Sequence, residues 1–147
     1  MFDKKANAIF ILIRPKQYIK NIFVLLPLFF AGQITDTALL INALMAFVAF
    51  SLSASAVYIF NDYEDIKEDR KHPKKKYRPL ASGLISKNTA LLLMTILFII
   101  SFTLMAKISL KALFILSIYV VLNIIYSLKL KRIALLDVTI IAIGFVL

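Results

Sequence analysis

The chain has 147 residues, of which 61% are hydrophobic, and it carries no cysteine, one histidine and a formal net charge of +10. Soluble globular proteins are only about 45–50% apolar. Because the apolar residues here also stand in long runs, the composition excludes soluble, disordered, collagenous and disulfide-scaffold proteins. The absence of cysteine excludes thiol catalysis, iron–sulfur clusters and cysteine-ligated zinc, and a single histidine excludes a histidine-cluster metal site. The composition therefore predicts a polytopic membrane protein.

The amino-terminal region combines a short apolar segment with basic flanks. Residues 1–20 contain five basic residues and one acid. The apolar stretch 8–13 is too short to span a bilayer, so we expect an interfacial helix there. A first membrane span is predicted over 19–33. A kink is expected at Pro27, because proline removes a backbone donor and clashes with the preceding turn.

The second apolar run is followed by the one long polar stretch of the chain. Residues 38–60 are unbroken and long enough for a second membrane span. The small residues Ser51 and Ser55, four positions apart, favour close packing against another helix. Residues 61–87 hold five acids, eight Lys/Arg and the single histidine, and are interpreted as an Asp-rich and basic loop.

Three further apolar runs complete the predicted bundle. We expect a third span over 88–106 and a fourth over 112–128. A fifth apolar segment, 133–147, has 15 residues. A spanning helix needs roughly 20, so the chain is expected to stop inside a helix. The whole of 1–147 is interpreted as a single all-α membrane domain.

The distribution of charge predicts the orientation of these spans. With five spans, the connections on the amino-terminal side hold 5, 8 and 3 basic residues, whereas the opposite ones hold none and 2. Basic residues concentrate in cytoplasmic loops. The N-terminus, the 61–87 loop and the turn at 129–132 are therefore expected on the cytoplasmic side of the inner (plasma) membrane, where they could meet at one site.

The polar stretch opens with an ordered series of carboxylates. If the second helix continues through it, Asp62, Asp65 and Asp69 lie at i, i+3 and i+7, on one helical face, and Asn61 adds a neighbouring oxygen. These acids repel one another unless a cation lies between them. Mg²⁺ prefers oxygen ligands and usually combines a few carboxylates with substrate phosphates. The alternative is a solvated acidic helix end, which is less favoured at the mouth of a membrane helix.

A basic cluster follows within ten residues of the acids. Alone, Lys74, Lys75, Lys76 and Arg78 would be typical of a cytoplasmic topology signal or a lipid-headgroup patch. Beside an acidic metal face, the cluster suits a diphosphate, whose oxygens an arginine can bind bidentately. His72, next to a proline, is interpreted as a structural hydrogen-bonding group rather than a base.

Two motifs carry a resemblance to a known family. The pattern Asn61-Asp62-x-x-Asp65-x-x-x-Asp69, followed by Arg78-Pro79-Leu80-Ala81-Ser82-Gly83, resembles the first aspartate-rich signature of the UbiA-type intramembrane prenyltransferase superfamily. The segments Asp69-Arg70-x-His72-Pro73-x-Lys75 and Arg14-Pro15-Lys16-Gln17-Tyr18-x-Lys20-Asn21 are similar to the decaprenyl-phosphate phosphoribosyltransferase branch.

This resemblance implies a helical fold of about nine spans, of which five are present. It also implies Mg²⁺-dependent transfer of 5-phosphoribose from phosphoribosyl pyrophosphate to a polyprenyl (decaprenyl) phosphate in the lipid bilayer. The residues it implies are catalytic Asp62, Asp65 and Lys131, substrate-binding Lys20, Asn21, Lys75, Arg78 and Tyr126, and metal-binding Asn61, Asp62, Asp65 and Asp69.

Several alternatives stay open. Tyr126 and Lys131 resemble the family's tyrosine-then-lysine motif at the end of the fourth helix, and Lys129 is an alternative for its lysine. The turn that holds both lysines also fits a plain membrane anchor. Asp137, a lone acid in an apolar segment, favours a functional or paired role. No acid follows it, although the family carries a second aspartate-rich motif, so the chain resembles an amino-terminal half. The alternative functions are prenyl transfer from a polyprenyl diphosphate to an aromatic or glycerol-phosphate acceptor, and a non-catalytic membrane fragment.

Overall fold

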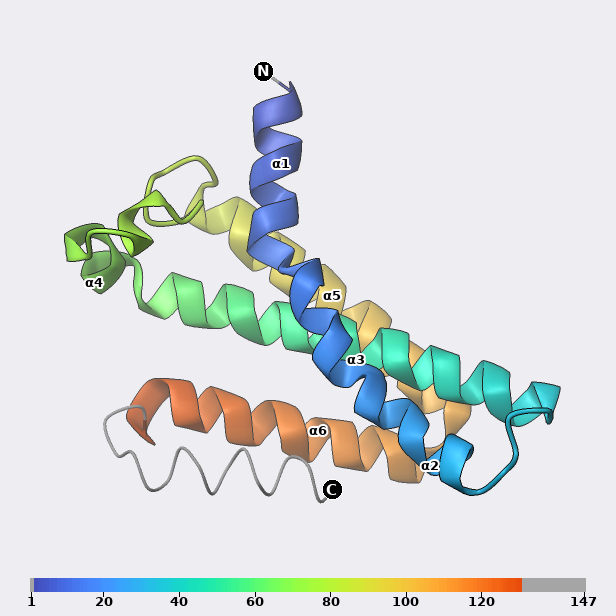
Figure 1. Cartoon of the computed structure of the whole chain (residues 1–147). Coiled ribbons are helices and arrows are strands. Elements are labelled where there is room, and N and C mark those ends of the chain that lie inside the picture. Colours follow the sequence, from blue (N-terminus) through green and yellow to red (C-terminus); the bar gives the residue numbers. More distant parts are fainter. Residues whose placement is uncertain (1, 131–147) are drawn as a thin grey trace.

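The computed structural model describes residues 2–130, and the regular elements of this part of the chain are all helices, joined by turns and loops (Figure 1). The all-α fold predicted from the sequence is confirmed. The elements in chain order are α1 (Phe2–Ile13), the 3₁₀-helix η1 (Pro15–Leu25), α2 (Leu26–Phe30), α3 (Thr37–Glu64), α4 (Ile66–Lys71), the 3₁₀-turn η2 (Lys75–Tyr77), α5 (Lys87–Ile108), α6 (Leu110–Ile125) and the π-helical turn η3 (Tyr126–Leu130).

Three helices are long and apolar enough to cross a membrane. They are α3 with 28 residues, α5 with 22, and the helical stretch Leu110–Leu128 with 19. They correspond to the second, third and fourth predicted spans, and they make the chain an integral membrane protein. A 28-residue helix is about 42 Å long, whereas the hydrocarbon core is about 30 Å thick. The last turns of α3 can therefore carry charged residues beyond that core.

The predicted first span has a different geometry. Residues 19–33 lie in η1, in α2 and in the turn that follows, rather than in one α-helix. The change from 3₁₀ to α geometry falls at Leu26, one residue before Pro27. Because a 3₁₀-helix rises about 2.0 Å per residue, Pro15–Phe30 still extends about 30 Å, close to the thickness of the hydrocarbon core. The predicted fifth span, 133–147, lies outside the described residues.

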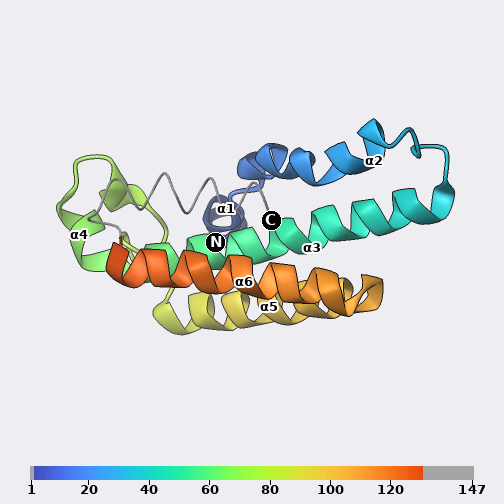
Figure 2. The ribbon, with the colours of Figure 1, turned by 90° about the horizontal axis from the view of Figure 1, so that it is seen from below.

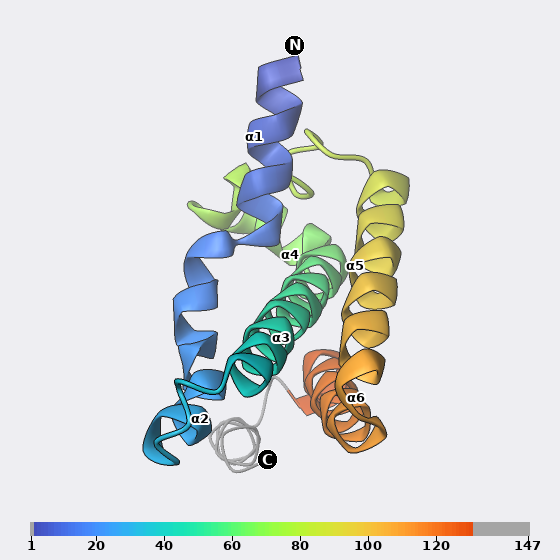
Figure 3. The ribbon, with the colours of Figure 1, turned by 90° about the vertical axis from the view of Figure 1, so that its right-hand side faces the viewer.

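Helix α3 lies at the centre of the bundle. Figures 2 and 3 show it between the amino-terminal segment on one side and the pair α5 and α6 on the other, and it contacts α1, η1, α5 and α6. Ser109 alone joins α5 to α6, and its hydroxyl accepts the Ala112 N–H at 3.0 Å, which caps α6. The short turn fixes α5 and α6 as antiparallel neighbours.

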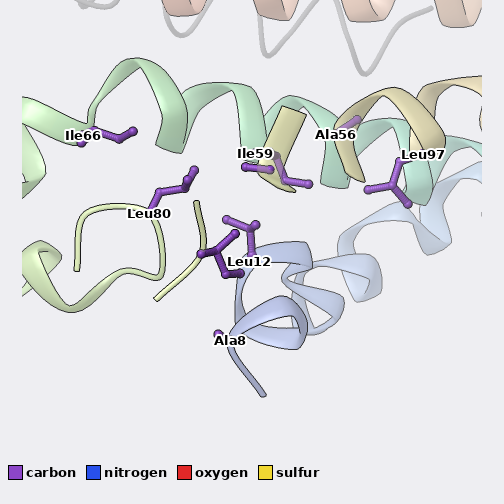
Figure 4. Packing of buried hydrophobic residues seen from close by; sticks show 9 residues of the cluster. Ala8, Leu12, Ala56, Ile59, Ile66, Leu80 and Leu97 are labelled. Carbon is purple, nitrogen blue, oxygen red and sulfur yellow. The ribbon is translucent and has the colours of Figure 1, made fainter. Parts of the chain in front are cut away.

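A cluster of buried aliphatic side chains packs the end of α3 that carries the acidic motif. Ala8 and Leu12 of α1 lie against Ile59 of α3 and Leu80 of the following loop (Figure 4). Lipid is as apolar as these side chains, so close packing rather than escape from water favours their association within the membrane. The cluster holds α1 and the loop together at one end of the bundle.

Candidate functional site

The acidic residues of the site lie at and around the junction between α3 and α4. Helix α3 extends into the acidic motif and ends at Glu64, and α4 begins at Ile66. Backbone bonds from Asp65 N–H to the Asn61 carbonyl (3.0 Å) and from Asp69 N–H to the Asp65 carbonyl (2.7 Å) carry helical geometry across the junction. Asp62 and Asp69 are both buried, and Asp65 is half-buried between them.

Two arginines neutralise the two buried carboxylates. Arg14 Nη2 donates to Asp62 Oδ1 at 2.7 Å, and Arg78 Nη1 donates to Asp62 Oδ1 at 3.2 Å and to Asp69 Oδ2 at 2.9 Å. The Asp62 side chain is 3% exposed, whereas both arginine side chains are 28% exposed. A buried carboxylate is costly unless it is paired and hydrogen-bonded. Two positive and two negative charges therefore form a balanced network, here called the arginine–aspartate cluster, whose cations remain accessible.

Arg14 is a functional candidate that the sequence reasoning missed. It follows α1 with φ 55° and ψ 55°, the left-handed region that glycine usually occupies at a helix end. This turn redirects the chain into η1 and brings the guanidinium to Asp62, where it also lies 5.0 Å from the centroid of the Tyr58 ring. The available signal was an arginine-proline pair immediately after an apolar run.

The segment Arg78–Gly83 folds as a tight turn that fixes Arg78. Ser82 N–H bonds to the Arg78 carbonyl at 2.8 Å, Gly83 has φ +82°, and Arg70 Nε donates to the Ala81 carbonyl at 3.0 Å. Leu80 and Ala81 are buried. The positive φ of Gly83 suits glycine, and the turn holds Arg78 between the two carboxylates.

A shallow pocket opens beside the cluster. It has a volume of about 220 Å³ and is lined by Asp65, Glu68, Asp69, His72 and Lys75. His72 Nδ1 accepts the backbone N–H groups of Lys74 (3.1 Å) and Lys75 (3.2 Å), so this ring orders the loop, as the sequence interpretation expected. The pocket joins carboxylates to a lysine, a combination that suits a metal-bound or protonated anion.

The carboxyl-terminal end of α6 reaches the acidic motif. Ser127 Oγ hydrogen-bonds Asn61 Oδ1 and also the Asn123 carbonyl at 2.8 Å, so η3 is fastened to the acidic motif. Tyr126, predicted to bind substrate, is half-buried next to Ser127. Lys131 lies outside the described residues. The predicted meeting of the amino-terminal region, the polar loop and the end of the fourth span at one site is thus observed as far as residue 130.

Two predicted substrate-binding residues lie away from the cluster. Asn21 Nδ2 donates to Ser51 Oγ at 3.2 Å, and Lys20 is exposed. Ser51 precedes Asp62 by eleven residues, which is about 16 Å along an α-helix. The structure therefore does not bring Asn21 to the carboxylates.

The predicted metal ligands match Mg²⁺ in donor chemistry, but arginines bind two of them, Asp62 and Asp69. Within residues 2–130 no group of three or more acidic or histidine side chains lies close enough together to hold a metal ion by itself. Asn61, Asp62, Asp65 and Asp69 all offer the oxygen donors that Mg²⁺ prefers. Arg78 stands between Asp62 and Asp69, and Arg14 bonds the same oxygen of Asp62, so a metal would bridge these two residues only after Arg78 moves aside.

The fold and the site together define a class of protein: a helical integral membrane protein with acidic and basic side chains gathered at one end of its bundle. The family comparison agrees with this description, since the model of the UbiA prenyltransferase family matches residues 21–147. The chain belongs to the UbiA prenyltransferase family.

Several similar proteins are named as transferases. The chain is 33% identical to the decaprenyl-phosphate phosphoribosyltransferase of Mycolicibacterium smegmatis, over 92% of this chain and 44% of the relative. It is 32% identical to that of Corynebacterium glutamicum, over 97% of this chain and 44% of the relative. A solved structure of digeranylgeranylglyceryl phosphate synthase superposes with a TM-score of 0.81 at 28% identity, covering 96% of this chain and 50% of that one. The chain spans about half the length of these relatives, or less.

Proposed function

We propose that the protein transfers 5-phosphoribose from phosphoribosyl pyrophosphate to a polyprenyl (decaprenyl) phosphate in the cytoplasmic leaflet. The observation that carries this proposal is Arg78 held between Asp62 and Asp69. The cluster supplies groups for both the metal and the anion of a metal–diphosphate complex. Two relatives named decaprenyl-phosphate phosphoribosyltransferase favour this donor and acceptor.

The arginines give the site its mode of anion recognition. An arginine binds phosphate oxygens through two parallel N–H donors, and such charge-assisted bonds are stronger than neutral ones. When a diphosphate enters, Arg78 exchanges its carboxylate partners for phosphate oxygens, and Lys75 at the rim of the neighbouring pocket adds a further positive charge. Asp69 then loses its arginine partner and Asp62 keeps only Arg14, so the pair of carboxylates needs another cation.

Mg²⁺ is the cation that these carboxylates would take. Asp62 and Asp69, with Asn61 and Asp65, would hold it, in agreement with their oxygen donors. When bound, the metal neutralises negative charge that develops on the departing pyrophosphate. Arg78 and Lys75 stabilise the same charge from the protein side. The acceptor needs no general base, because a phosphate monoester is already ionised at neutral pH.

A transfer assay tests the proposal. The protein in lipid nanodiscs would be given Mg²⁺, polyprenyl phosphate and phosphoribosyl pyrophosphate labelled in the ribose. We expect label in the lipid fraction, and we expect EDTA to abolish it. Label that enters the lipid equally well without a divalent cation would contradict the role given to Asp62 and Asp69.

Prenyl transfer is the second candidate function. It is favoured by the structural likeness to digeranylgeranylglyceryl phosphate synthase. The same cluster would then bind the diphosphate of a polyprenyl donor, and an aromatic or glycerol-phosphate compound would accept the chain. A parallel assay with labelled polyprenyl diphosphate separates the two reactions. Transfer only from that donor would replace phosphoribosyl transfer as the function.

A further inference from the structure

One face of α3 binds the amino-terminal segment through a row of polar contacts. Ser51, Ser55, Tyr58 and Asp62 follow one another at spacings of four, three and four residues, so they share a helical face. The amino-terminal segment contacts this face in the reverse order. Asn21 contacts Ser51, Tyr18 contacts Ser55, and Arg14 contacts both Tyr58 and Asp62. The two chain segments therefore run antiparallel, with one polar contact per turn.

The 3₁₀ geometry of η1 matches the pitch of α3. Residues three apart on a 3₁₀-helix lie on one side and are separated by about 6 Å along the axis, which is also the rise over four residues of an α-helix. Tyr18 and Asn21 therefore present their polar groups at the spacing of Ser55 and Ser51. This match gives a physical reason for an 11-residue 3₁₀-helix, a length well beyond the usual three or four residues.

Ser55 connects this row to the turn at Arg14. Its side chain is fully buried, its hydroxyl donates to the Ile13 carbonyl at 2.6 Å, and it accepts the Tyr18 hydroxyl at 2.5 Å. Ile13 is the last residue of α1, where carbonyl groups have no partner within the helix. Ser55 thus caps α1 from another helix, one residue before the left-handed turn that directs Arg14 to Asp62.

We propose that Ser55 is a positioning residue of the site: by bridging the Ile13 carbonyl and the Tyr18 hydroxyl, it holds the turn that delivers the Arg14 guanidinium to Asp62. Ser55 acts through Arg14 and touches no carboxylate itself. The sequence interpretation of Ser51 and Ser55 as helix-packing residues is thereby extended, because both hydroxyls bind the amino-terminal segment.

Hydrogen exchange of the full chain in nanodiscs tests this role directly, with peptides that cover residues 10–18. Ser55→Ala removes two hydrogen bonds at the turn, and we expect about tenfold faster exchange there. Tyr18→Phe, which keeps the bond to Ile13, should give a smaller increase and supplies a milder variant if Ser55→Ala folds poorly. Ser53→Ala is the matched control. Ser53 is equally buried on α3, but its hydroxyl bonds Ser101 of α5.

The expected pattern is specific to the turn. Ser53→Ala should leave exchange over residues 10–18 unchanged. Equal acceleration in Ser53→Ala, or none in both Ser55→Ala and Tyr18→Phe, would overturn the proposal. These measurements need no substrate, so their outcome does not depend on whether the protein catalyses the transfer reaction.

Coupling to Arg14 distinguishes positioning from simple packing. If Ser55 acts through Arg14, the loss in unfolding midpoint of the double variant Arg14→Ala with Ser55→Ala is smaller than the two single losses combined. The pair Arg14→Ala with Ser53→Ala should be additive, because these residues share no partner. Additive losses in the Ser55 pair as well would overturn the positioning role.

Discussion

Arg14 adopts a backbone conformation that favours glycine, yet only a long cationic side chain there can reach Asp62. Non-glycine residues in the left-handed region cost on the order of 1 kcal/mol. The position therefore combines a backbone cost with a charge partner for a buried carboxylate. Sequence reasoning missed this residue, because neither the turn nor the proximity of Asp62, 48 residues further along, is visible in a local pattern.

Two substitutions at position 14 distinguish the cost of its backbone conformation from the contribution of its charge. Arg14→Gly and Arg14→Ala both remove the ion pair, but only Gly relieves the left-handed conformation. We expect the glycine variant to be the more stable of the two by about 1 kcal/mol in chemical unfolding in detergent. An alanine variant as stable as the glycine variant would contradict the strain assigned to the turn.

Arg78 bridges two carboxylates with one guanidinium nitrogen, in a geometry set by the tight turn that follows it. Arg78→Lys replaces a planar fork by a point charge on a flexible stem. We expect a loss of about 1–2 kcal/mol in unfolding free energy and weaker phosphate binding. Lys111→Ala, at an exposed residue near the start of α6 and outside the basic cluster, serves as control and should change neither quantity. Equal effects from both variants would show that Arg78 has no special role.

Hydropathy along the sequence correctly predicts the three long membrane-spanning helices. The expected 38–60, 88–106 and 112–128 lie within or close to α3, α5 and the stretch 110–128, because long apolar runs admit only membrane helices. The form of the first span could not be predicted. Its 3₁₀ geometry depends on a register with α3 that arises only when the two segments pack.

The acidic motif was also predictable, since helical spacing places Asp62 and Asp69 near each other. What the spacing could not supply was the identity of their counter-charges. The sequence suggested a metal, whereas the structure pairs both carboxylates with arginines, one from the loop and one from the amino-terminal segment. Long-range partners of this kind are set by tertiary packing alone.

A chain of buried hydrogen bonds joins α3 to α5, and its loss should measurably lower the free energy of unfolding. Ser53 and Ser101 hydroxyls lie 2.6 Å apart, and Ser101 Oγ donates to the Ala49 carbonyl at 2.5 Å. Ser101→Ala should cost about 0.6–2 kcal/mol, the range for such bonds between membrane helices. Thr103→Ala is the control, because Thr103 is exposed and bonds only its own helix. No difference between the two variants would argue against this chain.

The absence of cysteine makes the predicted membrane topology of the chain easy to test. Single cysteines at Lys5, Lys76 and Gln33 can each be labelled with a membrane-impermeant maleimide in spheroplasts. Basic charge predicts that the Lys5 and Lys76 positions face the cytoplasm and react only after permeabilisation. Gln33, beyond the roughly 30 Å of η1 and α2, should react from outside. Labelling of all three positions from the same side would contradict the arrangement.

The arginine–aspartate cluster is expected to bind a diphosphate together with Mg²⁺. Equilibrium binding of labelled phosphoribosyl pyrophosphate to the protein in nanodiscs, with and without Mg²⁺, tests it most directly. We predict Mg²⁺-dependent binding that weakens at least about tenfold in Asp69→Asn, which removes a charged ligand. It should be unchanged in Glu64→Gln, an exposed acid at the same end of α3. Binding that needs no Mg²⁺ and survives Asp69→Asn would contradict the account.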